Sequence, residues 1–78
     1  MKVTFEEFRE LVKNEFEERM PQLDAEQVEE YLNSEDSVGV IKDEYAVSVK
    51  QFEKGEITEE QFRIGGASAA AHCLYMLY

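Results

Sequence analysis

A chain of 78 residues with a net charge of −10 is long enough for one domain. Surface scaling predicts a folded area of about 4,900 Å², so the core is small. A hydrophobic fraction of 44%, with five Phe and four Tyr, argues against intrinsic disorder. The excess of acidic side chains disfavours direct binding to nucleic-acid phosphates and to anionic lipids. We therefore treat residues 1–78 as a single domain that binds neither.

The single cysteine, Cys73, allows no intrachain disulfide, which is typical of a reducing compartment. No basic segment is followed by a continuous apolar run, as a signal peptide would require. The most apolar stretch, 64–78, has 15 residues that include two Gly, one Ser and one His. It is too short to span a bilayer. We expect a cytoplasmic protein without membrane contact.

Three segments carry the same start signal of an α-helix. In each, a capping residue is followed three positions later by Glu or Gln, as in a capping box: Thr4 with Glu7, Asp24 with Gln27, and Thr58 with Gln61. An apolar pair brackets each box at the spacing of a hydrophobic staple: Val3 with Phe8, Leu23 with Val28, and Ile57 with Phe62. The three coincidences together predict three helix starts.

The first two helices follow from apolar spacing. The first is predicted over 5–19, where one stripe recurs at steps of three and four residues: Phe5, Phe8, Val12, Phe16 and Met20. Pro21 ends it, because proline lacks a backbone donor and disfavours helix in the residue before it. The second is predicted over 25–33 and buries Val28, Tyr31 and Leu32.

The third segment, 36–54, allows two interpretations. A helix is favoured by Ser34 or Ser37 as its cap, by Gly55 as its stop, and by a stripe of Val38, Ile41, Tyr45, Val49 and Phe52. The alternative is an α+β fold with a hairpin at about 37–50, because Tyr45, Val47 and Val49 also alternate. The turn at 42–44 lacks the Gly or Asn of a tight hairpin, so we predict a helix.

The fourth helix begins after Thr58 and runs toward Tyr78. On a helical wheel it has two apolar faces, one with Phe62, Gly66, Ala69, Cys73, Met76 and Leu77, the other with Ile64, Ala67, Ala71, Leu74 and Tyr78. A helix that is apolar nearly all round is normally buried. The sequence therefore predicts an all-α, four-helix domain whose C-terminal helix is central.

Small side chains in this helix predict close packing against a neighbouring helix. They are Gly65, Gly66, Ala69, Ala70 and Cys73. Glycine inside a helix costs about 1 kcal/mol relative to alanine, so a compensating contact is expected.

The second apolar face predicts an interface. Three short helices give limited cover, and residues left outside would form an apolar patch of the kind that marks a binding surface. The residues of this predicted interface are Ile64, Ala67, Ala71, Leu74, Tyr75 and Tyr78. A homodimer through the C-terminal helix is one way to cover it.

Catalytic and metal-binding patterns do not emerge from the sequence. His72 and Cys73 are adjacent, so on a helix their side chains point about 100° apart and cannot act as a nucleophile and its base. One His and one Cys do not complete a zinc site. We therefore predict that the protein is not an enzyme and that it binds no metal ion and no cofactor.

Two functions from different classes fit these features. The first is a non-catalytic protein–protein interaction module whose partner is another protein or a second copy of the chain. The alternative is an acidic mimic of nucleic acid that inhibits a nucleic-acid-binding protein. It is suggested by residues 1–36, which hold 12 acidic and 4 basic side chains. Salt separates the two, because screening weakens a charge mimic more than an apolar contact.

Overall fold

The computed structural model describes residues 3–78 and is all-α, about 80% helical, with no strand in this range. Met1 and Lys2, which the predicted domain includes, lie outside the described residues. The elements are α1 (Phe5–Arg19), α2 (Ala25–Leu32), α3 (Glu35–Glu53), α4 (Glu59–Gln61), a π turn η1 (Phe62–Gly66), and α5 (Ala67–Leu77). The four-helix prediction is confirmed, and the hairpin alternative is not supported because α3 occupies its whole span.

The predicted capping residues begin their helices. Asp24 and Thr58 each form both halves of the capping box. Thr4 forms only one half, with its Oγ1 accepting from the Glu7 backbone N–H at 3.1 Å. The Glu7 carboxylate instead pairs with Arg63, at 3.1 Å between Oε2 and Nη2. The start of α1 is thereby tied to the last helix.

Helix α3 ends where the sequence predicts a stop. Gly55 has φ of +76°, in the left-handed region that glycine adopts without strain. Its N–H donates to the Phe52 carbonyl at 3.0 Å, and the Glu56 N–H donates to the Gln51 carbonyl at 2.9 Å. This pair of hydrogen bonds is a Schellman motif, which turns the chain back toward α4.

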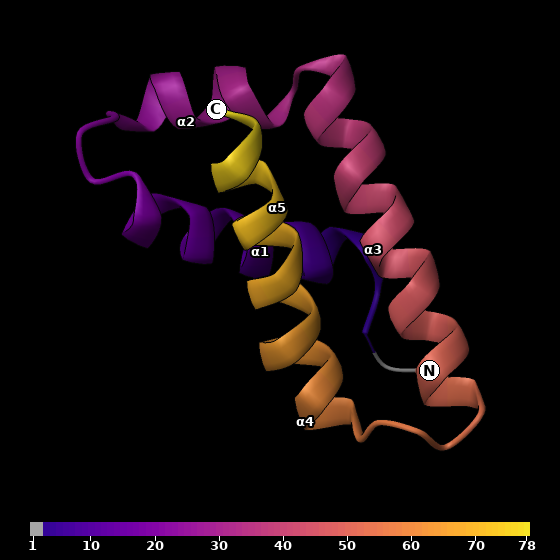
Figure 1. Ribbon diagram of the computed structural model, residues 1–78. Coiled ribbons are helices and arrows are strands. Elements are labelled where there is room, and N and C mark those ends of the chain that lie inside the picture. Colours follow the sequence, from indigo (N-terminus) through magenta and orange to yellow (C-terminus); the bar gives the residue numbers. More distant parts are fainter. Residues whose placement is uncertain (1–2) are drawn as a thin grey trace.

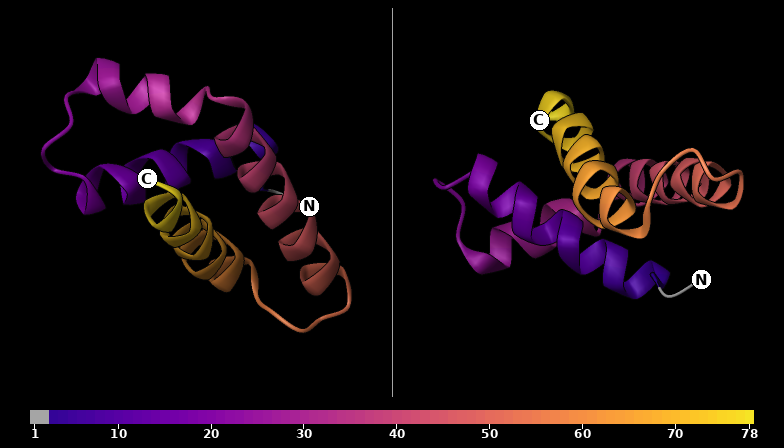
Figure 2. Two further views of the ribbon diagram at one scale, coloured as in Figure 1. Left: turned by 45° about the horizontal axis from the view of Figure 1, so that its top comes forward. Right: turned by 90° about the horizontal axis from the view of Figure 1, so that it is seen from below.

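The helices form two hairpins, α1 with α2 and α3 with the last helix (Figure 1). Helix α5 crosses α1, its most extensive neighbour, and lies beside α3, which the two turned views also show (Figure 2). The accessible surface is 4962 Å², close to the area predicted for a compact chain of this length. The largest fully buried side chains come from all four helices and include Phe8, Phe16, Leu32, Ile41, Phe62 and Leu74.

The π turn changes which face of the last helix is buried. A π turn adds one residue to the helix, so the residues after it are rotated by about 100° relative to an uninterrupted α-helix. Phe62 is buried before the turn, and the buried residues after it are Ala67, Ala70, Ala71 and Leu74. The wheel prediction assumed continuous α-helix and was therefore wrong about the phase of α5. One side of this helix is exposed, so it is not buried all round.

Gly66 is the point of closest approach between the last helix and its neighbours. A Cβ atom built on Gly66 would lie 2.8 Å from Ser48 Oγ and 3.2 Å from Phe8 Cε1. Distances this short leave no room for a side chain. At Gly65 an added Cβ would meet nothing within 4 Å. Only the second glycine of the pair is thus required by packing.

We expect Gly66→Leu to lower the free energy of unfolding by about 1–3 kcal/mol, because the new side chain overpacks the contact with Ser48 and Phe8. Gly65→Leu is the matched control and should leave stability unchanged or raise it, since it gains helix propensity without a clash. Urea unfolding followed by circular dichroism measures both. A Gly66→Leu midpoint at or above that of the wild type would contradict the packing described.

Two basic side chains of α1 hold α2 through one carboxylate. Glu29 Oε1 lies 2.9 Å from Lys13 Nζ, and Glu29 Oε2 lies 3.3 Å from Arg9 Nη2. The hydrogen bond from Lys13, followed by that from Arg9, lowers the pKa of Glu29 below its usual 4.5. The same hydrogen bond raises the pKa of Lys13. The charged form of Glu29 therefore stabilises the α1–α2 hairpin.

The contribution of Glu29 should depend on pH. A carboxyl whose pKa is lowered by folding stabilises the protein above its unfolded pKa and loses that effect as the pH falls through the folded value. We expect wild type to be more stable than Glu29→Gln at neutral pH, with the difference vanishing in acid below 4.5. Urea titrations over a pH series measure it, and a difference that persists in strong acid would refute the ion-pair assignment.

Candidate functional site

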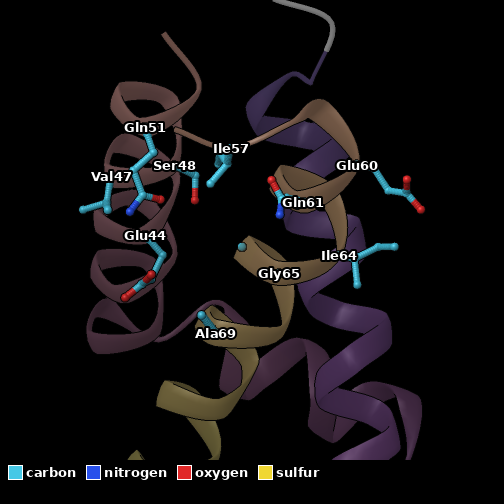
Figure 3. A pocket seen from close by; sticks show the side chains of 11 residues that line it. Glu44, Val47, Ser48, Gln51, Ile57, Glu60, Gln61, Ile64, Gly65 and Ala69 are labelled. Atoms are coloured by element: carbon cyan, nitrogen blue, oxygen red, sulfur yellow. The ribbon is translucent and has the colours of Figure 1, made fainter. Parts of the chain in front are cut away.

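A groove of about 620 Å³ lies between α3 and the last helix (Figure 3). We call it the α3–α5 groove. One wall is α3 and the other is α4, η1 and the start of α5, while the loop that joins α3 to α4 closes one end. The residues that line it are Glu44, Val47, Ser48, Gln51, Ile57, Glu60, Gln61, Ile64, Gly65, Gly66 and Ala69.

Small residues from both helices form the floor of the groove. Ser48 comes from α3 and is buried, and Gly66 packs against it. Gly65 and Ala69 follow on the same side of the last helix and are exposed. The groove exists because none of these four positions carries a large side chain. A partner's backbone can approach closely at such a floor.

Aliphatic side chains stand at the rims. Val47 on α3 is 51% exposed, and Ile64 on η1 is 61% exposed. Figure 3 shows Val47 and Ile64 at the outer edges of the two walls, directed away from each other, with Ile57 at the end formed by the loop. Exposed aliphatic groups on two facing walls favour an apolar occupant.

The charged groups that line the groove are the carboxylates of Glu44 and Glu60, one on each wall, and no lining residue is Lys or Arg. Arg63, the neighbour of Ile64, pairs instead with Glu7 at 3.1 Å and with Glu59 at 3.4 Å. Of the two basic residues next to lining residues in the sequence, Arg63 is thus engaged elsewhere, while Lys50, beside Gln51, is exposed. The groove combines an apolar floor with negative walls.

The residues predicted to pack closely divide into two groups. Gly66 is in tight contact with its neighbours, and Ala70 is buried. Gly65, Ala69 and Cys73 are exposed, which corrects the prediction for these three. The π turn is the physical reason for Ala69 and Cys73, which follow it and are rotated away from the side of Phe62, while Gly65 lies within the turn itself. Gly65 and Ala69 become lining residues of the groove.

The six residues predicted to form an interface also divide into buried and exposed ones. Ala67, Ala71 and Leu74 are at most 1% exposed, so they belong to the core and that part of the prediction is corrected. Ile64, Tyr75 and Tyr78 are exposed by 45% or more. Of the six, Ile64 lies at the groove, while Tyr75 and Tyr78 lie at the far end of α5.

Tyr78 is engaged with the junction of α2 and α3. Its hydroxyl lies 2.5 Å from Ser34 Oγ and 2.6 Å from Ser37 Oγ, and it donates to the Tyr31 carbonyl at 3.3 Å. Its ring centroid lies 4.5 Å from that of Tyr31. Tyr78 therefore anchors the end of α5 to the rest of the fold, although part of its ring faces solvent.

Sequence reasoning missed the α3 side of the groove. Glu44, Val47, Ser48 and Gln51 line one wall, yet none was singled out. One signal was present, because Val47 falls outside the helical stripe predicted for α3. A single apolar residue of this kind is common on protein surfaces, so it did not by itself point to the groove.

The groups that carry chemistry elsewhere in proteins are dispersed here. The Cys73 thiol lies 3.9 Å from Glu44 Oε1 on α3, and His72 is exposed. Within residues 3–78, no three His, Cys, Asp or Glu side chains lie close enough together to hold a metal ion. The polar groups of the groove are amides, one hydroxyl and two carboxylates. Such groups recognise a partner by hydrogen bonds and charge.

Across the part of the chain that the structure describes, no helix has both the length and the apolarity needed to cross a membrane.

Comparison with protein-family models, with curated proteins and with solved structures finds no match to this chain.

Proposed function

We propose that this protein is a non-catalytic protein–protein interaction module whose docking surface is the α3–α5 groove. The observation that carries the proposal is the groove itself, about 620 Å³ with exposed aliphatic side chains on both walls. Each of the four helices contributes buried side chains to a core elsewhere in the molecule. Val47 and Ile64 are thus apolar groups that folding leaves in water, as at many binding surfaces.

The groove has the form that a partner element needs. Its walls are two neighbouring helices, and its floor is made of small residues. A partner side chain placed over Gly65 would enter open space, since nothing lies within 4 Å of a Cβ atom there. Apolar anchors in such pockets dominate the affinity of many interfaces. Gln51 and Gln61 supply amide groups at the rim.

The acidic mimic is the rival function. Helices α1 and α2 expose six carboxylates, those of Glu6, Glu10, Glu17, Glu18, Glu26 and Glu30. Other carboxylates of these helices are engaged within the chain, as Glu29 is with Arg9 and Lys13. An acidic helix surface is common without being a binding site, so the groove is the better supported surface.

Self-association and a cytoplasmic location stay predictions. Repulsion between two chains of net charge −10 opposes a homodimer, but an apolar contact at the groove or at Tyr75 and Met76 can oppose that repulsion. The lone Cys73 remains the reason to expect a reducing compartment.

We expect the double variant Val47→Ser with Ile64→Ser to bind the protein's partner more weakly than the wild type does. Both side chains are exposed, so the fold should be retained while the apolar contact is removed. In affinity capture from cells that produce the protein, recovery of the partner should fall about tenfold or more. Circular dichroism verifies the fold.

Two variants control this experiment. Met76→Ser with Leu77→Ser removes equally exposed apolar groups outside the groove and should retain the partner. Glu10→Gln with Glu17→Gln changes the acidic surface of α1 and should also retain it. A partner lost only with the α1 variant would instead support the acidic mimic, and one kept by the groove variant would contradict the proposed function.

A further inference from the structure

We infer that the occupant of the α3–α5 groove is a basic, amphipathic α-helix of another protein. The inference rests on the proposed function and names the partner's chemistry. It follows from three properties of the groove: its shape, its charge and the form of its walls.

The shape fits a helix. The α3 wall from Glu44 to Gln51 covers about 10 Å along the helix axis, which is two turns. Helices that pack together come within about 8–10 Å of each other when the side chains between them are small. Gly65 and Ala69 on one wall and Ser48 on the other meet that condition. A third helix laid over the groove would cover the floor with its apolar side and be flanked by Val47 and Ile64.

The charge fits a basic partner. Glu44 and Glu60 place a carboxylate on each wall, and the chain around them has a net charge of −10. Four of the seven basic side chains described are engaged in ion pairs within the chain: Arg9, Lys13, Arg19 and Arg63. Lys or Arg beside an apolar stripe would meet a carboxylate on either wall. Complementary charge of this kind favours the correct partner and speeds association.

The form of the walls disfavours an extended peptide. Peptides that bind as strands gain affinity by pairing their backbone with the edge of a sheet. Residues 3–78 include no strand, and the backbone groups of both walls are engaged within helices. An amphipathic helix carries its own backbone hydrogen bonds and presents only side chains.

A second copy of this chain is a poor match. The apolar stripe of α1 is buried through Phe8, Val12 and Phe16, and that of α2 through Val28 and Leu32. The exposed sides of both helices are acidic, so they would repel Glu44 and Glu60. Helix α5 does expose Tyr75, Met76 and Leu77, but it carries no Lys or Arg to meet Glu44 and Glu60. None of these three helices therefore presents an exposed apolar stripe flanked by basic side chains.

Three synthetic peptides test the inference against the full chain. Each has about 18 residues, long enough for appreciable helix. The first places Leu and Ala on one helical face and Lys on the other; the second is its scramble; the third has Glu in place of Lys. Amide signals of the protein are followed by nuclear magnetic resonance during titration. We expect the first peptide to shift signals at 44–51 and 57–69, with the other two at least about tenfold weaker.

Variants of the protein test whether the first peptide binds at the α3–α5 groove. Gly65→Leu fills the floor and should weaken the first peptide about tenfold or more without unfolding the chain. Glu44→Gln with Glu60→Gln should weaken it severalfold and reduce its salt dependence. Glu10→Gln with Glu17→Gln removes the same charge from α1 and should change the affinity less than about twofold if binding is local.

Four results would overturn the inference: equal binding of the scramble, signal shifts confined to α1 and α2, equal binding of the Glu peptide at the groove, or no binding of any peptide. Sedimentation that showed a dimer broken by Gly65→Leu would also overturn it, because the occupant would then be a second copy. The proposed function fails separately, when a natural partner survives the loss of Val47 and Ile64. A groove that binds the Glu peptide would leave the proposed function standing.

Discussion

The close contact at Gly66 is the constraint on which the arrangement of the last helix depends. A Cβ atom added there would crowd the side chains of Ser48 on α3 and Phe8 on α1, so that both would have to shift. Gly66 is also the last residue of the π turn, so the contact with both neighbours is made where the helix changes phase. From this point Ala70, Ala71 and Leu74 face the core, while the opposite side of α5 is left open.

The groove is a consequence of that geometry. Because the helix is rotated, Gly65 and Ala69 meet the small Ser48 across a gap rather than inside the core. Ile64 is carried to the rim opposite Val47. Val47 and Ile64 are therefore not core residues left exposed by poor packing, because the buried core cluster does not include them. Changes at the exposed Val47 and Ile64 should therefore leave the fold intact, whereas Gly66 and Ser48 belong both to the groove and to the packing contact.

The charges of the chain have two different effects. Arg9, Lys13 and Arg63 join α1 to α2 and to the last helix through Glu29 and Glu7. In each of these ion pairs, a basic side chain is held by a carboxylate within the chain and is not free to pair with the exposed acidic side chains. The remaining carboxylates give the molecule a negative field, which includes both walls of the groove. Stabilising contacts between helices and the negative charge of the groove thus follow from the same distribution of charge.

Most of the fold could be predicted from local signals. Capping residues such as Asp24 and Thr58, and the stop at Gly55, depend on a few neighbouring residues, so the sequence shows them directly. The phase of α5 could not be predicted, because a π turn has no marker in hydrophobic spacing and shifts every later residue by about 100°. The groove was missed for the same reason, since Ala69 faces the groove only after this rotation.

The accessibility of the Cys73 thiol tests the central claim most directly, because the π turn decides whether this residue faces the core or the solvent. An uncharged maleimide should modify Cys73 in the folded protein nearly as fast as in urea. In a Cys73→Ser, Ala70→Cys variant, the thiol should be protected until the protein unfolds, since position 70 is fully buried. Protection of Cys73 in the folded protein, to the same degree as the thiol at position 70, would contradict the rotated helix, and with it the groove.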